Sequence, residues 1–278
     1  YAFSDCDNVT TLSIRANVVE DYAYEDMDGL TSATLYGATV GNGVFYDCND
    51  LQTVVIDGGV NSIGDDAFYN CGKLSSVTFN ESTNKLIIGY QPSSTDDVGP
   101  FYQSPLATIN LNREIEPSAT YKEQLDAWDM GIFTNKHYED VNLTTTVELG
   151  SNVKTIWPYM FSHVRMQNVT TPASVTSIGT GAFSYCYILT EVTVESTVDA
   201  INADVFTECS TLSTLNIPGS IGTIGAFTSL NLTSLNISGH VGTISANAFD
   251  NNDNMTSFTV TSTGSIGTIG AYAFEDCD

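Results

Sequence analysis

One aromatic residue recurs along the whole chain, and its spacing limits what the chain can fold into. The successive spacings are 21, 21, 23, 33, 32, 28, 22, 23, 21, 22 and 25 residues. The recurring positions are Phe3, Tyr24, Phe45, Phe68, Phe101, Phe133, Phe161, Phe183, Phe206, Phe227, Phe249 and Phe274. A period of this length indicates a solenoid, in which each repeat stacks only on its neighbours. The longer central spacings predict insertions there.

Each regular repeat has the same order of apolar residues. In "LQTVVIDGGVNSIGDDAF", which begins at Leu51, alternate apolar residues predict a strand with one buried face. A second short apolar segment follows a glycine turn, and Phe68 then opens a tight turn. The repeats that begin at Leu189 and Leu232 follow the same order. One repeat cannot bury such a face alone, so stacking is predicted to build a continuous core.

Several segments resemble the BspA-type leucine-rich repeat. They include "VNSIGDDAFYNCGKLSSVTF", "VTSIGTGAFSYCYILTEVTV" and "IGTIGAYAFEDC". In the middle, "PFYQSPLATINLNREI" (100–115) and "IFTNK" (132–136) are similar to elements of the bacterial branch of this family, with Asn112 where that branch usually has glycine. The expected fold is α/β and strongly β-rich. It is a right-handed solenoid of about 11–12 units of 21–33 residues, with a parallel sheet on one side and short turns or 3-10 segments on the other.

The repeats predict a single solenoid domain over residues 1–278. Regular repeats are expected over 1–80 and 147–278, and longer, insertion-bearing repeats over 81–146. The chain begins at "YAFSDC" and stops at "AYAFEDCD", which are the same repeat element. Because solenoids normally carry capping units, we expect a fragment of a longer protein.

The charge of the chain is strongly acidic. Eight Lys and Arg against 33 Asp and Glu give a formal net charge of −25, and Arg165 is the last Lys or Arg. Such a chain is repelled by nucleic acid and by anionic membrane surfaces, so neither is an expected partner. No apolar run reaches the length of a membrane span. The electrostatic field of this negative charge favours cationic partners or divalent ions.

All six cysteines occupy one repeat position, three residues after the recurring aromatic. They are Cys6, Cys48, Cys71, Cys186, Cys209 and Cys277. The same position elsewhere holds Met27, Ser104, Val164 or Asn252, which indicates a packing role for a small buried side chain. Disulfides are the alternative, because Cys48 with Cys71, and Cys186 with Cys209, fall in neighbouring repeats.

A catalytic thiol is disfavoured by the histidines. A nucleophilic cysteine needs a base within hydrogen-bond reach. His137, His163 and His240 fall at unrelated repeat positions, and no C-x-x-C spacing typical of zinc appears. The chain is therefore predicted not to be an enzyme.

The open face of the main strands is rich in short hydroxyl side chains. It is either a solvated face, on which Thr suits strands, or an extended contact surface for a polypeptide or glycan. The candidate binding residues on it are Ser75, Ser76, Thr78, Thr190, Glu191, Thr193, Ser213, Thr214, Asn216, Thr233, Ser234 and Asn236.

Carboxylates cluster around the cysteine-bearing turns. Examples are Asp5, Asp26, Asp47 and Glu275. Stacked turns bring some of them together, which predicts either solvated charges that keep the array soluble or weak Ca²⁺ binding through oxygen ligands. No other cofactor is expected.

The insertions, roughly 81–100 and 112–132, break the period. The first combines a strand-like "LIIGY" with a polar loop, and the second predicts a short helix with Leu125 and Trp128 facing inward. Insertions often contribute to the binding surface of a solenoid. The aromatic candidates are Tyr90, Tyr102, Tyr121 and Trp128.

These features, with the resemblance, predict a non-enzymatic binding module of adhesion type. The family resemblance implies a location outside the cell or on the outer cell surface. An extracellular protein or glycan is the expected partner, and the chain is expected to be monomeric. The alternative is a structural spacer that presents another domain. The ligand itself is not predicted, because repeat scaffolds accept many partners on one backbone plan.

Overall fold

The structure is a computed structural model that describes residues 1–37, 39–89, 99–119, 131–133, 143–227 and 230–277. The chain divides into two compact units, Tyr1–Asn152 and Val153–Asp278. Each unit is a stack of parallel strands and is described by itself. The single domain over 1–278 stays a prediction. Within the described residues, no helix has the length and apolar character needed to cross a membrane.

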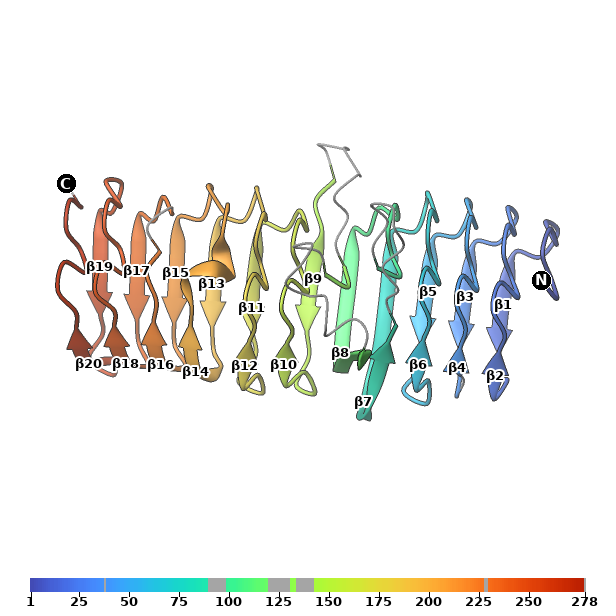
Figure 1. The fold of residues 1–278 in the computed structure, drawn as a ribbon, viewed down its shortest axis with the longest axis horizontal. Helices are drawn as coiled ribbons and strands as arrows, with labels where there is room; N and C mark the ends of the chain where they lie inside the picture. Colours follow the sequence, from blue (N-terminus) through green and yellow to red (C-terminus); the bar gives the residue numbers. More distant parts are fainter. Residues whose placement is uncertain (38, 90–98, 120–130, 134–142, 228–229, 278) are drawn as a thin grey trace. The chain divides into compact units, whose positions relative to one another are not determined.

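The first unit contains one nine-stranded sheet in which all pairs are parallel. Its strands are β1 (Thr11–Ile14), β2 (Val18–Val19), β3 (Ser32–Leu35), β4 (Thr39–Val40), β5 (Thr53–Ile56), β6 (Ser62–Ile63), β7 (Ser76–Ile88), β8 (Thr108–Pro117) and β9 (Thr146–Leu149). β1, β3, β5, β7, β8 and β9 form the main ladder, and β2, β4 and β6 form a second ladder that also joins β7 (Figure 1). The predicted second apolar segment of each repeat is therefore a strand in its own right.

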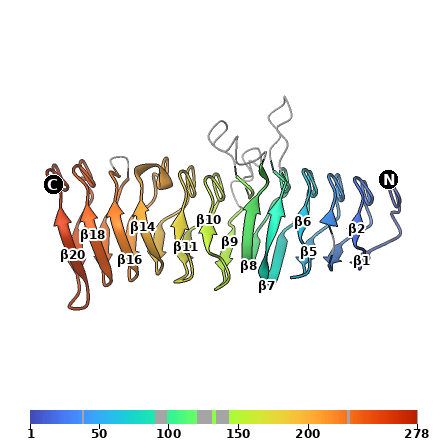
Figure 2. The ribbon, with the colours of Figure 1, turned by 60° about the horizontal axis from the view of Figure 1, so that its bottom comes forward.

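The second unit repeats this plan with three separate sheets. Its main ladder contains β11 (Asn168–Thr171), β13 (Glu191–Val194), β15 (Thr214–Ile217), β17 (Ser234–Ile237) and β19 (Ser257–Val260). The other sheets contain β10 (Thr155–Ile156) with β12 (Ser177–Ile178), and β14 (Thr197–Ile201), β16 (Ser220–Ile224), β18 (His240–Ile244) and β20 (Ser265–Ile269). A short 3-10 helix, η1, covers Ala203–Phe206. Figure 2 shows β14, β16, β18 and β20 following one another in sequence order.

The core is built by strict alternation along the main strands. In β5 and β13 every second side chain is buried, as the period predicted. Parallel pairing places equivalent residues of successive repeats opposite one another: Val54 faces Val77, and Val192 faces Leu215. The predicted β-rich, parallel, repeat-built fold is confirmed.

Most of the recurring aromatics form a buried ladder within each unit, stacked along much of its length and tilted at Phe227. The ring centroid of Phe68 lies 5.4 Å from that of Phe45 and 5.1 Å from that of Phe101, with interplanar angles of 9° and 1°. In the second unit, Phe161 and Phe183 are 5.7 Å apart at 6°. All five rings are at most 1% exposed. Burial and offset stacking together make this ladder the centre of the turn packing.

The turn around each aromatic needs left-handed backbone. The residue two positions after the aromatic has φ between 52° and 58° at Asp5, Asp26, Asp47 and Asn70. Asp and Asn tolerate this region better than most L-residues, because their short polar side chains bond locally. The backbone therefore favours acidic and amide residues at the turns, independently of any ligand.

The first insertion lengthens a strand. The predicted strand-like segment is confirmed, because Leu86–Ile88 ends β7 and pairs with β8. Asn112 lies inside β8 and not in a turn. The neighbouring Arg113 is fully buried and donates to the carbonyls of Asp57 (3.2 Å) and Asn84 (3.0 Å). The short helix predicted in the second insertion lies mostly outside the described residues.

Truncation of Phe68 tests the aromatic ladder. We expect Phe68→Ala to lower the free energy of unfolding by about 3–5 kcal/mol, because it leaves a cavity between two stacked rings. Denaturant unfolding measures the loss. Tyr1→Ala is the matched control, since that ring is 76% exposed and should cost less than about 1 kcal/mol. Equal losses in the two variants would contradict the central role of the ladder.

Candidate functional site

The hydroxyl face separates into rows with different roles. The first row bonds to the preceding repeat: the hydroxyls of Ser75, Thr190 and Ser213 donate to the backbone carbonyls of Gln52, Gln167 and Thr190, at 3.3, 3.0 and 3.1 Å. Thr233 donates to Ser213 in the same way. These four predicted binding residues help to stack the repeats, so their hydroxyl hydrogens are already used.

The remaining predicted face residues form two further rows. Glu191, Thr214 and Ser234 lie in register in one row, and Thr193, Asn216 and Asn236 in the other. Ser76 and Thr78 occupy the corresponding positions of β7 in the first unit. These side chains remain candidates for contact with a partner.

An amide ladder runs along the last of these rows. Asn236 Nδ2 donates to Asn216 Oδ1 at 2.9 Å. Asn216 Nδ2 in turn lies 2.7 Å from Glu191 Oε1 and 3.4 Å from Thr193 Oγ1. The carbonyl and the amino group of Asn216 both have partners, so the hydrogen bonds of this stretch of the face are satisfied within the protein.

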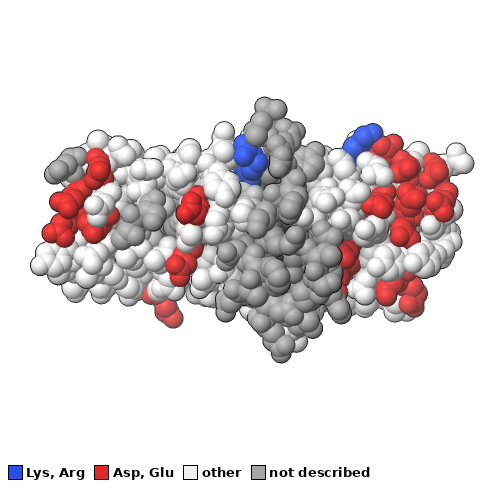
Figure 3. All heavy atoms as spheres, turned by 45° about the horizontal axis from the view of Figure 1, so that its top comes forward, with Lys and Arg blue, Asp and Glu red and all other residues white. Residues whose placement is uncertain are grey.

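The acidic turns of the first unit are partly held by hydrogen bonds between repeats. Asp7 accepts from the backbone N–H of Asp28, and Asp28 accepts from Asn49 Nδ2 at 3.1 Å. Figure 3 shows carboxylates gathered over the first repeats. The described residues contain no group of three His, Cys, Asp or Glu side chains arranged to hold a metal ion. Calcium binding stays a prediction that the geometry does not strengthen.

Four of the cysteines are buried, and their thiols contact backbone carbonyls of the preceding repeat. All six are free thiols. The thiol of Cys71 lies 3.1 Å from the carbonyl of Phe45, and that of Cys209 lies 3.0 Å from the carbonyl of Phe183. Ser104 Oγ and Asn252 Nδ2 make the equivalent contact, donating to the carbonyls of Phe68 and Phe227 at 2.7 and 3.3 Å. The position therefore accepts a small side chain that can donate to the turn of the preceding repeat.

Burial makes Cys48, Cys71 and Cys186 poor nucleophiles. It raises the pKa of Cys48 to about 12, and it raises the pKa values of Cys71 and Cys186 well above their usual range. A thiol with such a pKa holds its proton at neutral pH. Of the histidines, His240 begins β18 and contacts Ser265, His163 stacks on Tyr185, and His137 lies outside the described residues.

The aromatic candidates of the insertions have a mixed outcome. Tyr90, Tyr121 and Trp128 lie outside the described residues, so their binding role stays a prediction. Tyr102 is only 2% exposed, and its ring stacks 5.7 Å from that of Tyr69. The expectation that Tyr102 offers an aromatic surface is therefore wrong, because the ring belongs to the turn packing.

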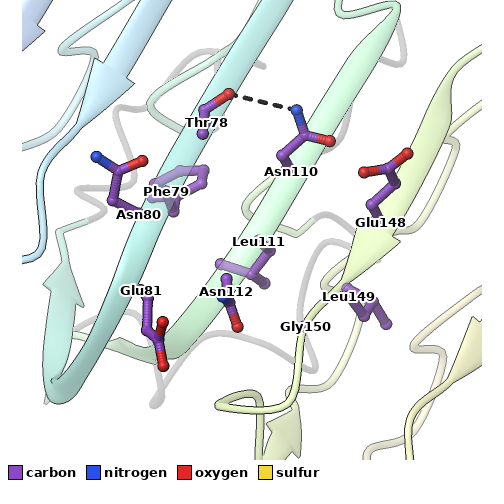
Figure 4. Close-up of a pocket in the computed structure, with 10 residues that line it drawn as sticks. All are labelled: Thr78, Phe79, Asn80, Glu81, Asn110, Leu111, Asn112, Glu148, Leu149 and Gly150. Carbon is purple, nitrogen blue, oxygen red and sulfur yellow. Dashed lines mark hydrogen bonds between the residues drawn. The ribbon is translucent and has the colours of Figure 1, made fainter.

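A pocket of about 370 Å³ opens on the main ladder between β7, β8 and β9. It is lined by Thr78, Phe79, Asn80, Glu81, Asn110, Leu111, Asn112, Glu148, Leu149 and Gly150 (Figure 4). Thr78, Asn110 and Glu148 lie in register across the three strands, while the buried Phe79 and Leu111 belong to the core beneath. This size lies at the lower end of the range for small-molecule sites.

The polar groups of the pocket include three amides and two carboxylates. Asn110 Nδ2 donates to Thr78 Oγ1 at 3.3 Å, but Asn110 Oδ1 is buried without a hydrogen-bond partner among the described residues. At the other end, Asn152 Nδ2 donates to Glu81 Oε1 at 3.2 Å and lies 3.5 Å from Asn112 Oδ1. Gly150 makes room for Asn112, since a Cβ there would lie 2.1 Å from Asn112 Oδ1.

Sequence reasoning found only Thr78 among these lining residues. The others fall next to insertions, where the period no longer fixes which residues share a row. The signal that was available is the segment "TINLN" (108–112), which has the same alternation as a regular strand. Aligning it with "TVELG" (146–150) would have placed Asn110 beside Glu148.

Another row of polar residues links turns of the first unit. The backbone N–H of Asn42 donates to Asp21 Oδ1 at 2.7 Å, and that of Asp65 donates to Asn42 Oδ1 at 2.9 Å. Asp65 Oδ1 is buried without a partner in the described part of the chain. Burial, reinforced by Asp66 and Asp21, raises the pKa of Asp65 to about 6. Ionised Asp65 therefore destabilises the fold.

The burial of Asp65 predicts that Asp65→Asn increases the stability of the protein by an amount that depends on pH. Between pH 4 and 6 the folded state holds a proton that the unfolded state has released, so the native chain loses stability as pH rises through this window. We expect Asp65→Asn to raise the free energy of unfolding by on the order of 1 kcal/mol at pH 7.5, and by much less near pH 4. Urea unfolding at both pH values measures this. Glu20→Gln, an exposed change of equal charge, should show no such difference.

Thiol accessibility tests the buried cysteine position. In denaturant without reductant we expect all six thiols to react with a disulfide reagent. In the native chain the two partly exposed thiols, Cys6 and Cys277, should react first, and the other four only as the protein unfolds. A count near two in denaturant would show instead that Cys48–Cys71 and Cys186–Cys209 form disulfides.

Comparisons with known proteins gave similar solved structures and one family match. No curated protein matches the chain. Three similar solved structures are bacterial. A leucine-rich repeat protein from Bacteroides ovatus shows 16% identity over 97% of this chain and 85% of its own, with a TM-score of 0.41. One from Eubacterium ventriosum shows 19% identity over 99% and 91%, with a TM-score of 0.39.

A leucine rich cell surface protein from Faecalibacterium prausnitzii shows 18% identity over 97% of this chain and 86% of its own, with a TM-score of 0.36. The family described as "BspA type Leucine rich repeat region" matches residues 1–91, 131–256 and 223–278, in six copies. These matches span well over half of the sequence and include all of the regular repeats, 1–80 and 147–278. The chain belongs to the BspA-type leucine-rich-repeat family.

Proposed function

We propose that this chain is a non-enzymatic binding module of a cell-surface or secreted protein. Its open strand face would contact an extracellular protein or glycan. The observation that carries the proposal is the pocket between β7, β8 and β9, which interrupts a regular polar face and contains one buried acceptor, Asn110 Oδ1, without a partner among the described residues. A strand face that served only as a scaffold would not require a pocket that interrupts its polar rows.

The spacer role is the second candidate, and the polar rows of the second unit favour it. The amide of Asn216 is satisfied within the ladder, and the hydroxyls of Ser213 and Thr233 bond to backbone. A face that satisfies its own hydrogen bonds gains little from a partner. The two functions therefore differ in whether any substitution on the face affects binding.

A binding screen with matched face variants tests the proposal. The wild-type chain is screened against extracellular-matrix proteins and glycans at physiological salt. Thr78→Arg places a bulky cation at the pocket on the main ladder, and Thr268→Arg places the same charge on β20 of the other ladder. We expect Thr78→Arg to weaken a partner's affinity by about tenfold or more, and Thr268→Arg to leave it unchanged.

The structure also shows that deleting the insertions would not be a clean test of binding. Deletion of residues 81–132 would remove part of β7 and the whole of β8, and with them core residues such as Leu86 and Ile109. Loss of binding in that deletion would report misfolding. If no partner binds the wild-type chain, or if both arginine variants bind equally well, the spacer function is favoured.

A further inference from the structure

A second row of aromatic rings runs beside the phenylalanine ladder of the first unit. Tyr46 and Tyr69 each follow the recurring aromatic directly, so they occupy the same position in neighbouring repeats. Their ring centroids lie 4.6 Å apart, and their planes differ by 7°. The other Tyr–Tyr contacts among the described residues have centroid distances of 5.7 to 6.2 Å and interplanar angles of 13° to 64°. These two phenols are therefore the closest and the most nearly parallel of such pairs.

The turns hold these two rings in register. The residues on either side of Tyr46 are Phe45 and Asp47, and their backbone N–H groups donate to carbonyls of the next repeat at 2.8 and 3.0 Å. The second of these acceptors is the carbonyl of Tyr69 itself. The side chains are linked as well, since Asn70 Nδ2 donates to Asp47 Oδ1 at 2.7 Å. Little conformational freedom therefore remains to be lost if the two rings react with each other.

Stacking limits the chemistry that these rings can offer to a ligand. Tyr46 and Tyr69 turn one ring face towards each other, and their further ring contacts are with Tyr22 and Tyr102. Cations bind over the faces of aromatic rings, and those faces are engaged within the row. Both tyrosines nevertheless keep part of their surface exposed, so a small reagent can reach them. What the pair offers is two phenols in contact at the protein surface.

We propose that Tyr46 and Tyr69 form a site of oxidative cross-linking, at which a peroxidase that uses hydrogen peroxide joins the two rings as dityrosine. Each phenol gives up one electron and one proton, and these reduce hydrogen peroxide to water. The two phenoxyl radicals pair their odd electrons in a bond between their ortho carbons. The ortho hydrogens then move to the phenol oxygens, which restores both aromatic rings. Two phenols and one hydrogen peroxide thus give one dityrosine and two water molecules.

The cross-link ties two neighbouring repeats together. It closes a loop between the turn of Tyr46 and that of Tyr69, which removes freedom from the unfolded chain and makes these turns harder to open. The thiols of the same two repeats do not compete for the oxidant, because Cys48 and Cys71 are fully buried. The site is independent of the proposed binding function, since it requires only the stacked pair and an oxidant.

Peroxidase treatment of the folded chain tests the proposal. The dilute chain is treated with a haem peroxidase and hydrogen peroxide, and is then cleaved at aspartate residues. Asp57 lies between the two tyrosines in the sequence, so their cross-link appears as two joined peptides that together have lost two hydrogen atoms. We expect this pair to be the main tyrosine cross-link, in chains that remain monomeric. The same treatment in denaturant should give about tenfold less of it or lower, because the turns no longer align the rings.

Phenylalanine variants identify the phenols that react. Tyr46→Phe and Tyr69→Phe each remove one hydroxyl and keep the ring, so the stack is retained. We expect each variant to lose most of the dityrosine fluorescence of the treated, folded chain. Tyr36→Phe is the matched control, because Tyr36 is also half-buried but lies under the guanidinium of Arg15, 3.8 Å from its ring centroid. Its fluorescence should equal that of the wild type.

Several results would overturn the proposal. One is dityrosine that forms equally well in denaturant, and another is a main cross-link between Tyr1 and Tyr22, the more exposed stacked pair. Equal losses of fluorescence in Tyr36→Phe and Tyr46→Phe would also reject it. N-acetyltyrosine amide in a parallel reaction shows that the oxidant is active. If that compound couples and the folded chain gives no Tyr46–Tyr69 link, the assignment of this site is wrong.

Discussion

Parallel pairing in register is the constraint on which the rest of this structure depends, because it sets each residue against its own counterpart in the next repeat. Stacking of equivalent residues stabilises aromatic rings and aliphatic side chains, as the near-parallel rings of Phe68 and Phe101 show. Stacked carboxylates are destabilising instead, since like charges repel. The first unit relieves that repulsion by alternating acids with amides: Asn42 stands between Asp21 and Asp65, and Asn70 donates to Asp47.

The insertion-bearing repeats show what happens when the register is interrupted. β7 and β8 pair regularly as far as Phe79 and Leu111, and the register then shifts. A backbone carbonyl in the shifted stretch needs a donor inside the protein. Arg113 donates to the carbonyl of Asn84 in that stretch, and also to that of Asp57 after β5, which gives a structural reason for the arginine in the "LNREI" segment. The pocket opens on the same strands, so the place where the repeat is irregular is also where the face differs chemically.

Most of the fold could be predicted from the sequence, and most of the candidate site could not. Alternating apolar residues and the aromatic period identify the main strands, and Met27, Ser104 and Asn252 at the cysteine position identify its packing role. The strands and the packing role of the cysteine position are determined by residues that lie close together in the sequence. The register that sets Asn110 beside Glu148 spans the second insertion, and the missing hydrogen bond of Asn110 becomes visible only by comparison with the Asn216–Asn236 pair. Likewise, the four hydroxyls that stack repeats look the same in sequence as those that face solvent.

The thiol-to-carbonyl contact has a consequence for how such arrays diverge. Because the acceptor is a backbone carbonyl, the donor at Cys71 or Cys209 does not depend on which side chain the preceding repeat carries. Repeats can therefore be duplicated, lost or exchanged by recombination while the turns remain satisfied. The pairs on the open face are different, since Asn216 needs both Glu191 and Asn236. Shuffling would preserve the core and rewrite the face, so binding properties can change faster than the scaffold that displays them.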